Sequence, residues 1–421
     1  MSLFTPHRLL AAVLATLLTG CSSVAWQGQV RPDSDTVARA LNGAETQVAL
    51  WDLPADSLPH FPVPQNVRPC CAFGNLQKVA IGRVPIPLFR LGNTVGAGDV
   101  GPHQFDGGTF AYTSSGASAN GNRGSENNGM IYTLQGGFID LAHVRDTADD
   151  TVALFFEMVR HLGEEHRIEL PDEIGERYIQ MQTVELPELT NRERWELAAE
   201  LAARMAYFKA ESHEIAQWHG YASFAGWPET VSAFSPEDLY SNMLGAKLAR
   251  ALISANLVLN SDLYNQSMTL WLDEALDWLG AVDRGTSNAL FDVIDGHWWD
   301  SSRPIPAKYM VTLRHYQMGD QQTPYLVPVE WARDSRHWDR LDTFLAAGQQ
   351  PHPLALQPQM FGLELDTLAQ VVMTVSPRYQ ASFAQFDEAL WRHGFTHLDY
   401  PAIVSRSREL DQIEYQKLLG Q

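Results

Sequence analysis

The chain of 421 residues has few basic residues and only three cysteines. Its 30 lysines and arginines stand against 50 aspartates and glutamates, a formal net charge of −20, and no basic stretch is dense enough to follow a phosphate backbone. This balance excludes a nucleic-acid partner from the expected functions. The ordinary glycine and proline content and the 45% hydrophobic fraction exclude collagen-like and disordered chains, and the length leaves room for two or three domains.

Long apolar runs are also scarce. The one notable run, Leu9–Leu18, follows Arg8 and spans ten residues, whereas a membrane-spanning helix needs about 20. A short apolar run behind a basic residue is typical of a signal peptide. Nothing later in the chain is long and apolar enough to cross a bilayer, so we expect no membrane-spanning helix after this run.

The four residues Leu18-Thr19-Gly20-Cys21 resemble a bacterial lipobox. The resemblance implies that residues 1–20 are a lipoprotein signal peptide and that Cys21 receives fatty acyl chains such as palmitate, which anchor residues 21–64 as a tether. Because Ser22 rather than an aspartate follows the cysteine, it also implies an outer-membrane lipoprotein that faces the periplasm. An ordinary cleaved signal peptide is the alternative.

The other two cysteines, Cys70 and Cys71, are adjacent in an apolar stretch. Three states stay open for them. They could be two small buried hydrophobic residues, a strained vicinal disulfide, or a pair containing a nucleophilic thiol, which would need a base nearby.

Hydrophobic periodicity indicates a mainly α protein of the α+β class, with a helical core and a small β element near the N-terminus. Short β-type runs occur at residues 79–81, 86–89 and 131–133. The period then becomes helical, and a further helix is expected to open with Ser235 as its N-cap and Pro236 in its first turn. The remaining helices are expected at residues 140–162, 191–219, 263–279, 363–375 and 381–393, and near residue 413.

Three strings in the chain are long and unusual: RPCCAFG at residues 68–74, GGFIDLAHVRD at 136–146 and SAFSPEDLYSN at 232–242. They resemble an uncharacterised family of exported bacterial proteins, known as a domain of unknown function. The resemblance covers residues 65–300, which we expect to form a helical core domain, and it implies no activity. Residues 301–421 are expected to form a C-terminal helical extension.

The helix expected at residues 140–162 has a polar stripe. His143, Asp146, Asp150, Glu157 and His161 lie within about 60° of one another on a helical wheel. Imidazole and carboxylate groups one turn apart are suited to a Zn²⁺ site or to general acid–base chemistry. A solvated helix face is the alternative, and it is favoured for the last three residues. The first two lie beside a Gly-Gly turn, where a second layer of protein could cover them.

The second long helix contributes two glutamates, Glu211 and Glu214. Glu211 lies close to the apolar line of this helix, so a buried carboxylate there must be paired, bound to a metal or shifted in pKa. The alternative is a boundary glutamate that reaches water. His213 and His219 do not form a zinc-protease motif, because they are six residues apart and not four.

Glu237 and Asp238 follow a serine and a proline at the expected start of the next helix. Acidic residues in a first turn are stabilised by the helix dipole, and we favour that role for both. A role as metal ligands is the alternative.

Three functions follow from these patterns. In the first, the protein is a metal-dependent hydrolase acting on peptidoglycan, lipid or peptide in the cell envelope. His143 would be a metal ligand or base, and the further ligands or acid–base groups would be Asp146, Glu211 and Glu214. Zn²⁺ is one candidate metal, and its identity stays open between Zn, Mn and Fe.

In the second function, a thiol hydrolase or acyltransferase uses Cys70 or Cys71 as its nucleophile, with His103 or His143 as its base. In the third, the protein is a non-catalytic periplasmic binding or scaffold lipoprotein. Convergent histidine and carboxylate side chains in one cavity would favour the first function.

Overall fold

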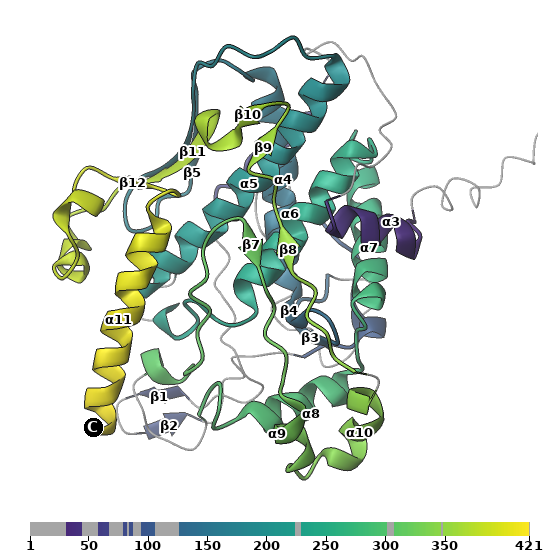
Figure 1. Cartoon of the computed structure of the whole chain (residues 1–421), viewed down its shortest axis with the longest axis vertical. Coiled ribbons are helices and arrows are strands. Elements are labelled where there is room, and N and C mark those ends of the chain that lie inside the picture. Colours follow the sequence, from purple (N-terminus) through teal and green to yellow (C-terminus); the bar gives the residue numbers. More distant parts are fainter. Residues whose placement is uncertain are drawn as a thin grey trace, which may run out of the picture.

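The computed structural model describes residues 31–43, 58–66, 79–81, 84–86, 94–105, 126–223, 229–300, 307–346 and 348–420. These residues contain nine α-helices and several small antiparallel sheets (Figure 1). The mainly α class with mixed α+β content is therefore confirmed. The expected signal peptide and lipobox with Cys21, and the pair Cys70 and Cys71, lie outside the described residues.

Three long helices form the centre of the molecule: α4 (Leu141–Arg160), α5 (Asn191–Trp218) and α6 (Asp238–Ser254) (Figure 1). The first two match the predicted ranges within two residues. Their starts are specified locally, because Asp140 caps α4, and Thr190 caps α5 through a reciprocal capping box with Glu193.

Helices α4 and α6 approach each other unusually closely at Gly245. A Cβ atom built on this glycine would lie 2.1 Å from the carbonyl oxygen of Val144, closer than real side chains come to backbone. Glycine is therefore required here so that the two helix backbones can touch. The contact joins the first turn of α4 to a point two turns into α6, and it holds the starts of the two helices close together.

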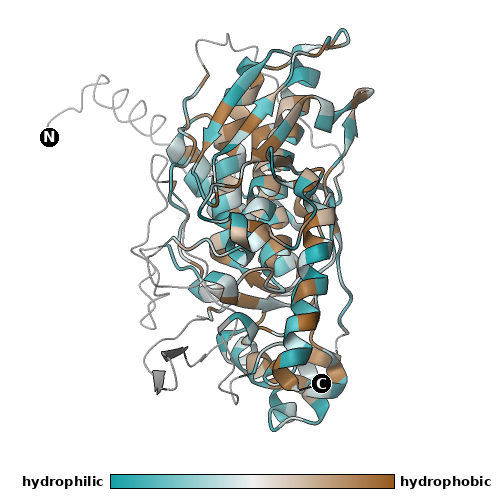
Figure 2. Cartoon of the chain, turned by 90° about the vertical axis from the view of Figure 1, so that its left-hand side faces the viewer, coloured by the Kyte–Doolittle hydropathy of each residue, from teal (hydrophilic) through white to brown (hydrophobic). Residues whose placement is uncertain are grey.

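The remaining helices surround this centre. Helices α3 and α7 pack together on one side, and α11 packs against α5 on another (Figure 1). The helices display apolar and polar segments side by side in Figure 2, as amphipathic elements should. None of the helices in the described ranges has an apolar stretch long enough to cross a bilayer. Their bounds are α3 (Ser34–Leu41), α7 (Ser261–Trp278), α8 (Arg284–Ile294), α9 (Val329–Arg333), α10 (Trp338–Ala346) and α11 (Tyr400–Leu419).

A four-stranded antiparallel sheet packs beside the central helices, in the order β12-β11-β6-β5. Its strands are β5 (His166–Leu170), β6 (Arg177–Met181), β11 (Ala369–Met373) and β12 (Phe395–Thr396). The prediction of helices at residues 363–375 and 381–393 is wrong. The first range contains β11, whose residues alternate between buried and half-buried because it pairs with β6, and the second forms short 3-10 turns.

The other strands form two-stranded pairs. The hairpin of β3 and β4 turns at Gly137, whose φ of +66° and close approach to the Tyr325 carbonyl exclude a side chain. The predicted strands at residues 79–81 and 131–133 are confirmed. The pairs are β1 (Val79–Ile81) with β2 (Val84–Ile86), β3 (Met130–Thr133) with β4 (Gly137–Asp140), β7 (Gln321–Gln322) with β8 (Leu354–Ala355), and β9 (Gln359–Met360) with β10 (Leu363–Glu364).

The polar stripe of α4 is not one solvated face. Asp150 was expected to be exposed, and that prediction is wrong: it is 6% exposed, and Lys209 of α5 donates to both of its carboxylate oxygens at 2.6 Å. Helix α5 covers this part of α4 and supplies the compensating charge. Glu157 and His161, further along the stripe, are half-buried.

We expect Gly245→Ala to destabilise the protein by about 1–3 kcal/mol, because the added methyl group would force the backbones of α4 and α6 apart. The intrinsic helix propensity of alanine acts in the opposite direction by roughly 1 kcal/mol, so a net loss reports the steric conflict. Urea unfolding followed by circular dichroism measures this change. Gly98→Ala is the control, since no atom lies within 4 Å of its Cβ position. Equal stability of the two variants would contradict the close approach.

Candidate functional site

Strand β4 runs directly into α4 at Asp140, which fixes the position of the first helical turn. The carboxylate of Asp140 accepts a hydrogen bond from the backbone N–H of Ala142 at 2.8 Å. Its own backbone N–H donates to the hydroxyl of Ser241 at 2.9 Å, which ties the start of α4 to the start of α6. His143 follows on the same turn of α4.

The turn before α6 contains a strained residue. Phe234 has a φ of +57°, in the left-handed region that bulky side chains rarely occupy, and its N–H donates to Oε2 of Glu214 at 2.5 Å. Ser235 does not cap the helix as predicted, because its hydroxyl donates to Glu237 at 2.6 Å and α6 begins at Asp238. The turn therefore presents its polar groups to carboxylates.

Five side chains from these helix starts and from α5 form what we call the buried acidic cluster: Asp140, His143, Glu214, Glu237 and Asp238. The four carboxylate residues are at most 1% exposed, and the His143 side chain is 12% exposed. Nδ1 of His143 lies 3.1 Å from Oδ1 of Asp238. Asp140, His143 and Asp238 each offer one ligand atom, and these three atoms lie within 4.8 Å of one another.

The cluster contains more negative charge than its surroundings neutralise. Burial, followed by repulsion from Asp238, raises the pKa of Glu214 to about 8, and the charges of His213 and His143 oppose this rise. Burial and the charge of Asp238 also raise the pKa of Glu237 well above its usual value. Burial raises the pKa of Asp238 as well, despite the ion pair with His143.

Several oxygens of the cluster have no hydrogen-bond donor in the described part of the chain: Oδ2 of Asp140, Oε1 of Glu214 and Oε1 of Glu237. Within the same residues, no lysine or arginine forms an ion pair with these three side chains or with Asp238. Buried carboxylates in this condition require either protons or a cation. A donor set of carboxylate oxygens and one imidazole nitrogen suits Zn²⁺, Mn²⁺ or Fe²⁺.

The residues predicted as metal ligands divide into two groups. His143 and Glu214 lie in the buried acidic cluster. Asp146 is half-buried one turn along α4 and is not among the three residues with converging ligand atoms. Glu211 belongs to a different network: its Oε1 accepts the N–H of Gly319 at 2.7 Å, and burial raises its pKa to about 8.

Sequence reasoning favoured a helix-start role for Glu237 and Asp238, with metal ligation as the alternative, and did not single out Asp140 as a ligand. Each has such a position, but the packing of α4 against α6 also turns them toward one another. A usable signal was present, since the strings at residues 136–146 and 232–242 supply four of the five cluster members.

His103 is one of the two bases considered for a thiol mechanism, and both of its ring nitrogens contact carboxylates. Its Nδ1 lies 3.1 Å from Oε1 of Glu126, and its Nε2 lies 2.7 Å from Oδ1 of Asp149. Burial opposes protonation, but the two carboxylates outweigh it and raise the pKa of His103 to about 9. The ring is therefore charged at neutral pH and is poorly suited to accept a proton there.

Comparison with known proteins supplies a family but no activity. The family DUF4056, described as a protein of unknown function, matches residues 58–328. Because this match covers more than half of the chain, the chain belongs to that family, which confirms the predicted membership of a domain of unknown function. No curated protein and no solved structure matches the chain.

The charged His103 predicts a pH dependence of stability. Since its pKa rises from 6.5 to about 9 on folding, its contribution is fully present below pH 6.5 and is lost as the pH rises through 9. The contribution is up to about 3 kcal/mol. We expect His103→Gln to flatten the decline in unfolding free energy between pH 6 and pH 9, measured by urea titration. His393→Gln, at an exposed histidine, should keep the wild-type decline; identical slopes in all three proteins would refute the assignment.

Proposed function

We propose that this member of the DUF4056 family binds a divalent metal ion in the buried acidic cluster and uses it to hydrolyse a substrate of the bacterial envelope. One observation carries the proposal. Four carboxylates and a histidine meet at the starts of two helices, and the described residues provide no lysine or arginine ion pair for the carboxylates. A bound cation would remove this imbalance.

Asp140, His143 and Asp238 are the metal ligands in this proposal. Their ligand atoms converge within 4.8 Å, so small rotations bring them to the distances of about 2.0–2.2 Å that Zn²⁺ requires. Three protein ligands leave a coordination position for water, which is the arrangement of catalytic zinc sites. His143 is the most exposed ligand, so water and substrate would enter from its side.

Glu214 is the proton acceptor in this proposal, because the charge of a bound cation would lower its raised pKa and leave it ionised at neutral pH. A metal ion lowers the pKa of bound water towards 7, and a neighbouring carboxylate then needs to take only one proton. Glu214 lies close enough to Asp238 and His143 for both charges to affect its pKa. The N–H of Phe234 fixes one oxygen of Glu214 and leaves Oε1 without a donor among the described residues. Oε1 is therefore the oxygen that would accept a proton from the water.

The envelope location is part of the proposal and depends on the lipobox-like residues at Cys21. An acylated protein on the periplasmic face of the outer membrane meets peptidoglycan, lipids and peptides. Each of these substrates contains ester, amide or glycosidic bonds that water can cleave. In this proposal, the location suggests the substrate class and the cluster suggests the reaction type.

Metal analysis tests the binding step. We expect purified protein to contain at least about one equivalent of Zn, Mn or Fe, and we expect Asp238→Asn to weaken the affinity of the cluster for that metal more than about tenfold. The affinity is measured by chelator competition. Glu211→Gln is the matched control, because Glu211 is also a buried glutamate of α5 but lies in another network. Circular dichroism verifies that each variant is folded. Equal affinity in Asp238→Asn and wild type would refute this ligand set.

Substitution of the proton acceptor tests the catalytic step. Glu214→Gln should keep the metal and lower the turnover number by about 10²- to 10⁴-fold, the range for loss of a general base. Product release from purified peptidoglycan, phospholipid vesicles and a mixed peptide set is followed by mass spectrometry. Glu211→Gln should retain wild-type turnover. Hydrolysis that survives both Glu214→Gln and removal of the metal by a chelator would show that the reaction takes place elsewhere.

A further inference from the structure

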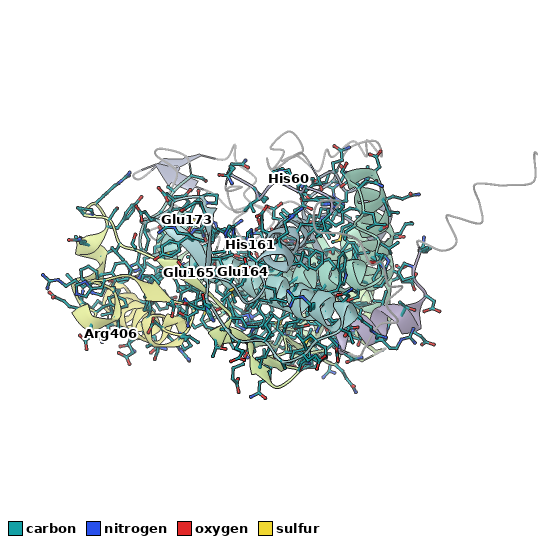
Figure 3. The ribbon with its side chains drawn as sticks, turned by 90° about the horizontal axis from the view of Figure 1, so that it is seen from above. His60, His161, Glu164, Glu165, Glu173 and Arg406 are labelled. Atoms are coloured by element: carbon teal, nitrogen blue, oxygen red, sulfur yellow. The ribbon has the colours of Figure 1, made fainter. Side chains whose placement is uncertain are left out.

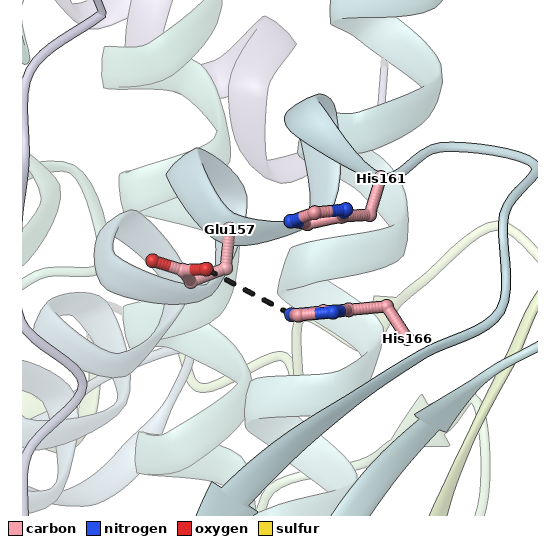
Figure 4. Close-up of side chains that lie close together, drawn as sticks. All are labelled: Glu157, His161 and His166. Carbon is pink, nitrogen blue, oxygen red and sulfur yellow. Dashed lines mark ion pairs between the residues drawn. The ribbon is translucent and has the colours of Figure 1, made fainter.

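Three side chains at the opposite end of α4 form a second group of metal-binding residues. Glu157 lies in the last turn of α4, His161 caps the helix, and His166 begins β5 (Figure 4). We call this group the α4–β5 site. His143 and His161 are 18 positions apart, about 27 Å along a helix at 1.5 Å per residue, so the α4–β5 site is separate from the buried acidic cluster.

The local structure places the three side chains together. Glu157 and His161 are four residues apart, and residues with that spacing share one face of a helix. The chain then reverses through a short turn and enters β5 at His166, which stacks its ring on His161 with centroids 3.8 Å apart and planes 13° from parallel. One nitrogen of each ring faces the Glu157 carboxylate in Figure 4.

The distances in this group suit an ion more than direct hydrogen bonds. Nε2 of His166 lies 3.9 Å from Oε2 of Glu157, beyond hydrogen-bond range. Two ligands of a zinc ion are each about 2.0–2.2 Å from the metal, so atoms about 3.3–4 Å apart can share one. Glu157, His161 and His166 each offer one atom within 4.8 Å of the other two.

The side chains also have the freedom and the access that binding needs. Their exposed fractions are 26% for Glu157, 33% for His161 and 29% for His166, so an ion can enter from solvent and the rings can adjust by an ångström. Glu164, labelled with His161 in Figure 3, has its Oε2 3.7 Å from Nδ1 of His161 and adds negative charge at the rim.

We propose that Glu157, His161 and His166 bind Zn²⁺, with solvent in the fourth position. Two imidazoles and one carboxylate are a common donor set for this ion. The bound ion joins the end of α4 to β5, which is an edge strand of the four-stranded sheet. Zinc binding therefore stabilises the folded protein by cross-linking the central helices to the sheet.

Titration with zinc chloride tests the proposal. Zn²⁺ is added to metal-free full-length protein in competition with a colorimetric chelator, and the Asp238→Asn background removes the contribution of the buried acidic cluster. We expect one zinc equivalent to remain in this background and His166→Ala to weaken its binding more than about tenfold. His393→Ala is the control for loss of an exposed histidine.

Two further measurements keep the result unambiguous. In the Asp238→Asn protein, the imidazole NMR signals of His161 and His166 should shift when zinc is added. The melting temperature of this protein should also rise with zinc, whereas that of the Asp238→Asn/His166→Ala protein should not. Circular dichroism verifies the fold of each variant. If His166→Ala and His393→Ala bind zinc with the same stoichiometry and affinity, the α4–β5 site does not exist, whatever the outcome at the buried acidic cluster.

Discussion

The contact between Gly245 of α6 and the backbone of Val144 in α4 is the constraint on which the rest of this structure depends. Val144 directly follows His143, and Gly245 lies two turns after Asp238. Because the backbones touch at this point, the first turns of both helices are side by side, and the acids that begin them share one buried space. A wider helix separation would leave the same residues as two ordinary, independently capped helix starts.

Several of the other buried acids in the described residues have a basic partner. His103 lies between two carboxylates, with Arg145 3.6 Å from one of them, and Asp150 pairs with Lys209. The buried acidic cluster differs, since its four carboxylates have one ion pair in the described part of the chain, with His143, although the charges of His213 and Arg314 also act on Glu214. Arg314, which lies beside the same turn, donates instead to backbone carbonyls. Four buried carboxylates with one ion pair among them have the electrostatic pattern expected of a cation site.

Local signals in the sequence were sufficient for the long helices but insufficient for the sheet. Helices α4 and α5 could be predicted because their apolar positions recur at the helical period and polar residues cap their starts. Strand β11 could not, because its pairing partner β6 lies nearly 200 residues earlier, and a run of apolar residues is ambiguous without that partner. Asp150 was misassigned for the same reason, because Lys209, which pairs with it, lies on α5 and not on α4.

The candidate sites show the same division between local and long-range information. The three residues of the proposed α4–β5 site lie within residues 157–166, so a helical spacing and one turn are enough to bring them together. The residues of the buried acidic cluster come from three helices and lie up to about 100 residues apart in the sequence. Glu211 and Glu214 are only three residues apart but belong to different hydrogen-bond networks. The N–H of Gly319 donates to Glu211, and the N–H of Phe234 donates to Glu214. The ligands of the cluster converge only after α4, α5 and α6 have packed, so an ion bound there must be released whenever that packing is lost. Metal occupancy of the cluster would therefore be linked to global folding, whereas occupancy of the proposed α4–β5 site would be linked mainly to the junction between one helix and one strand.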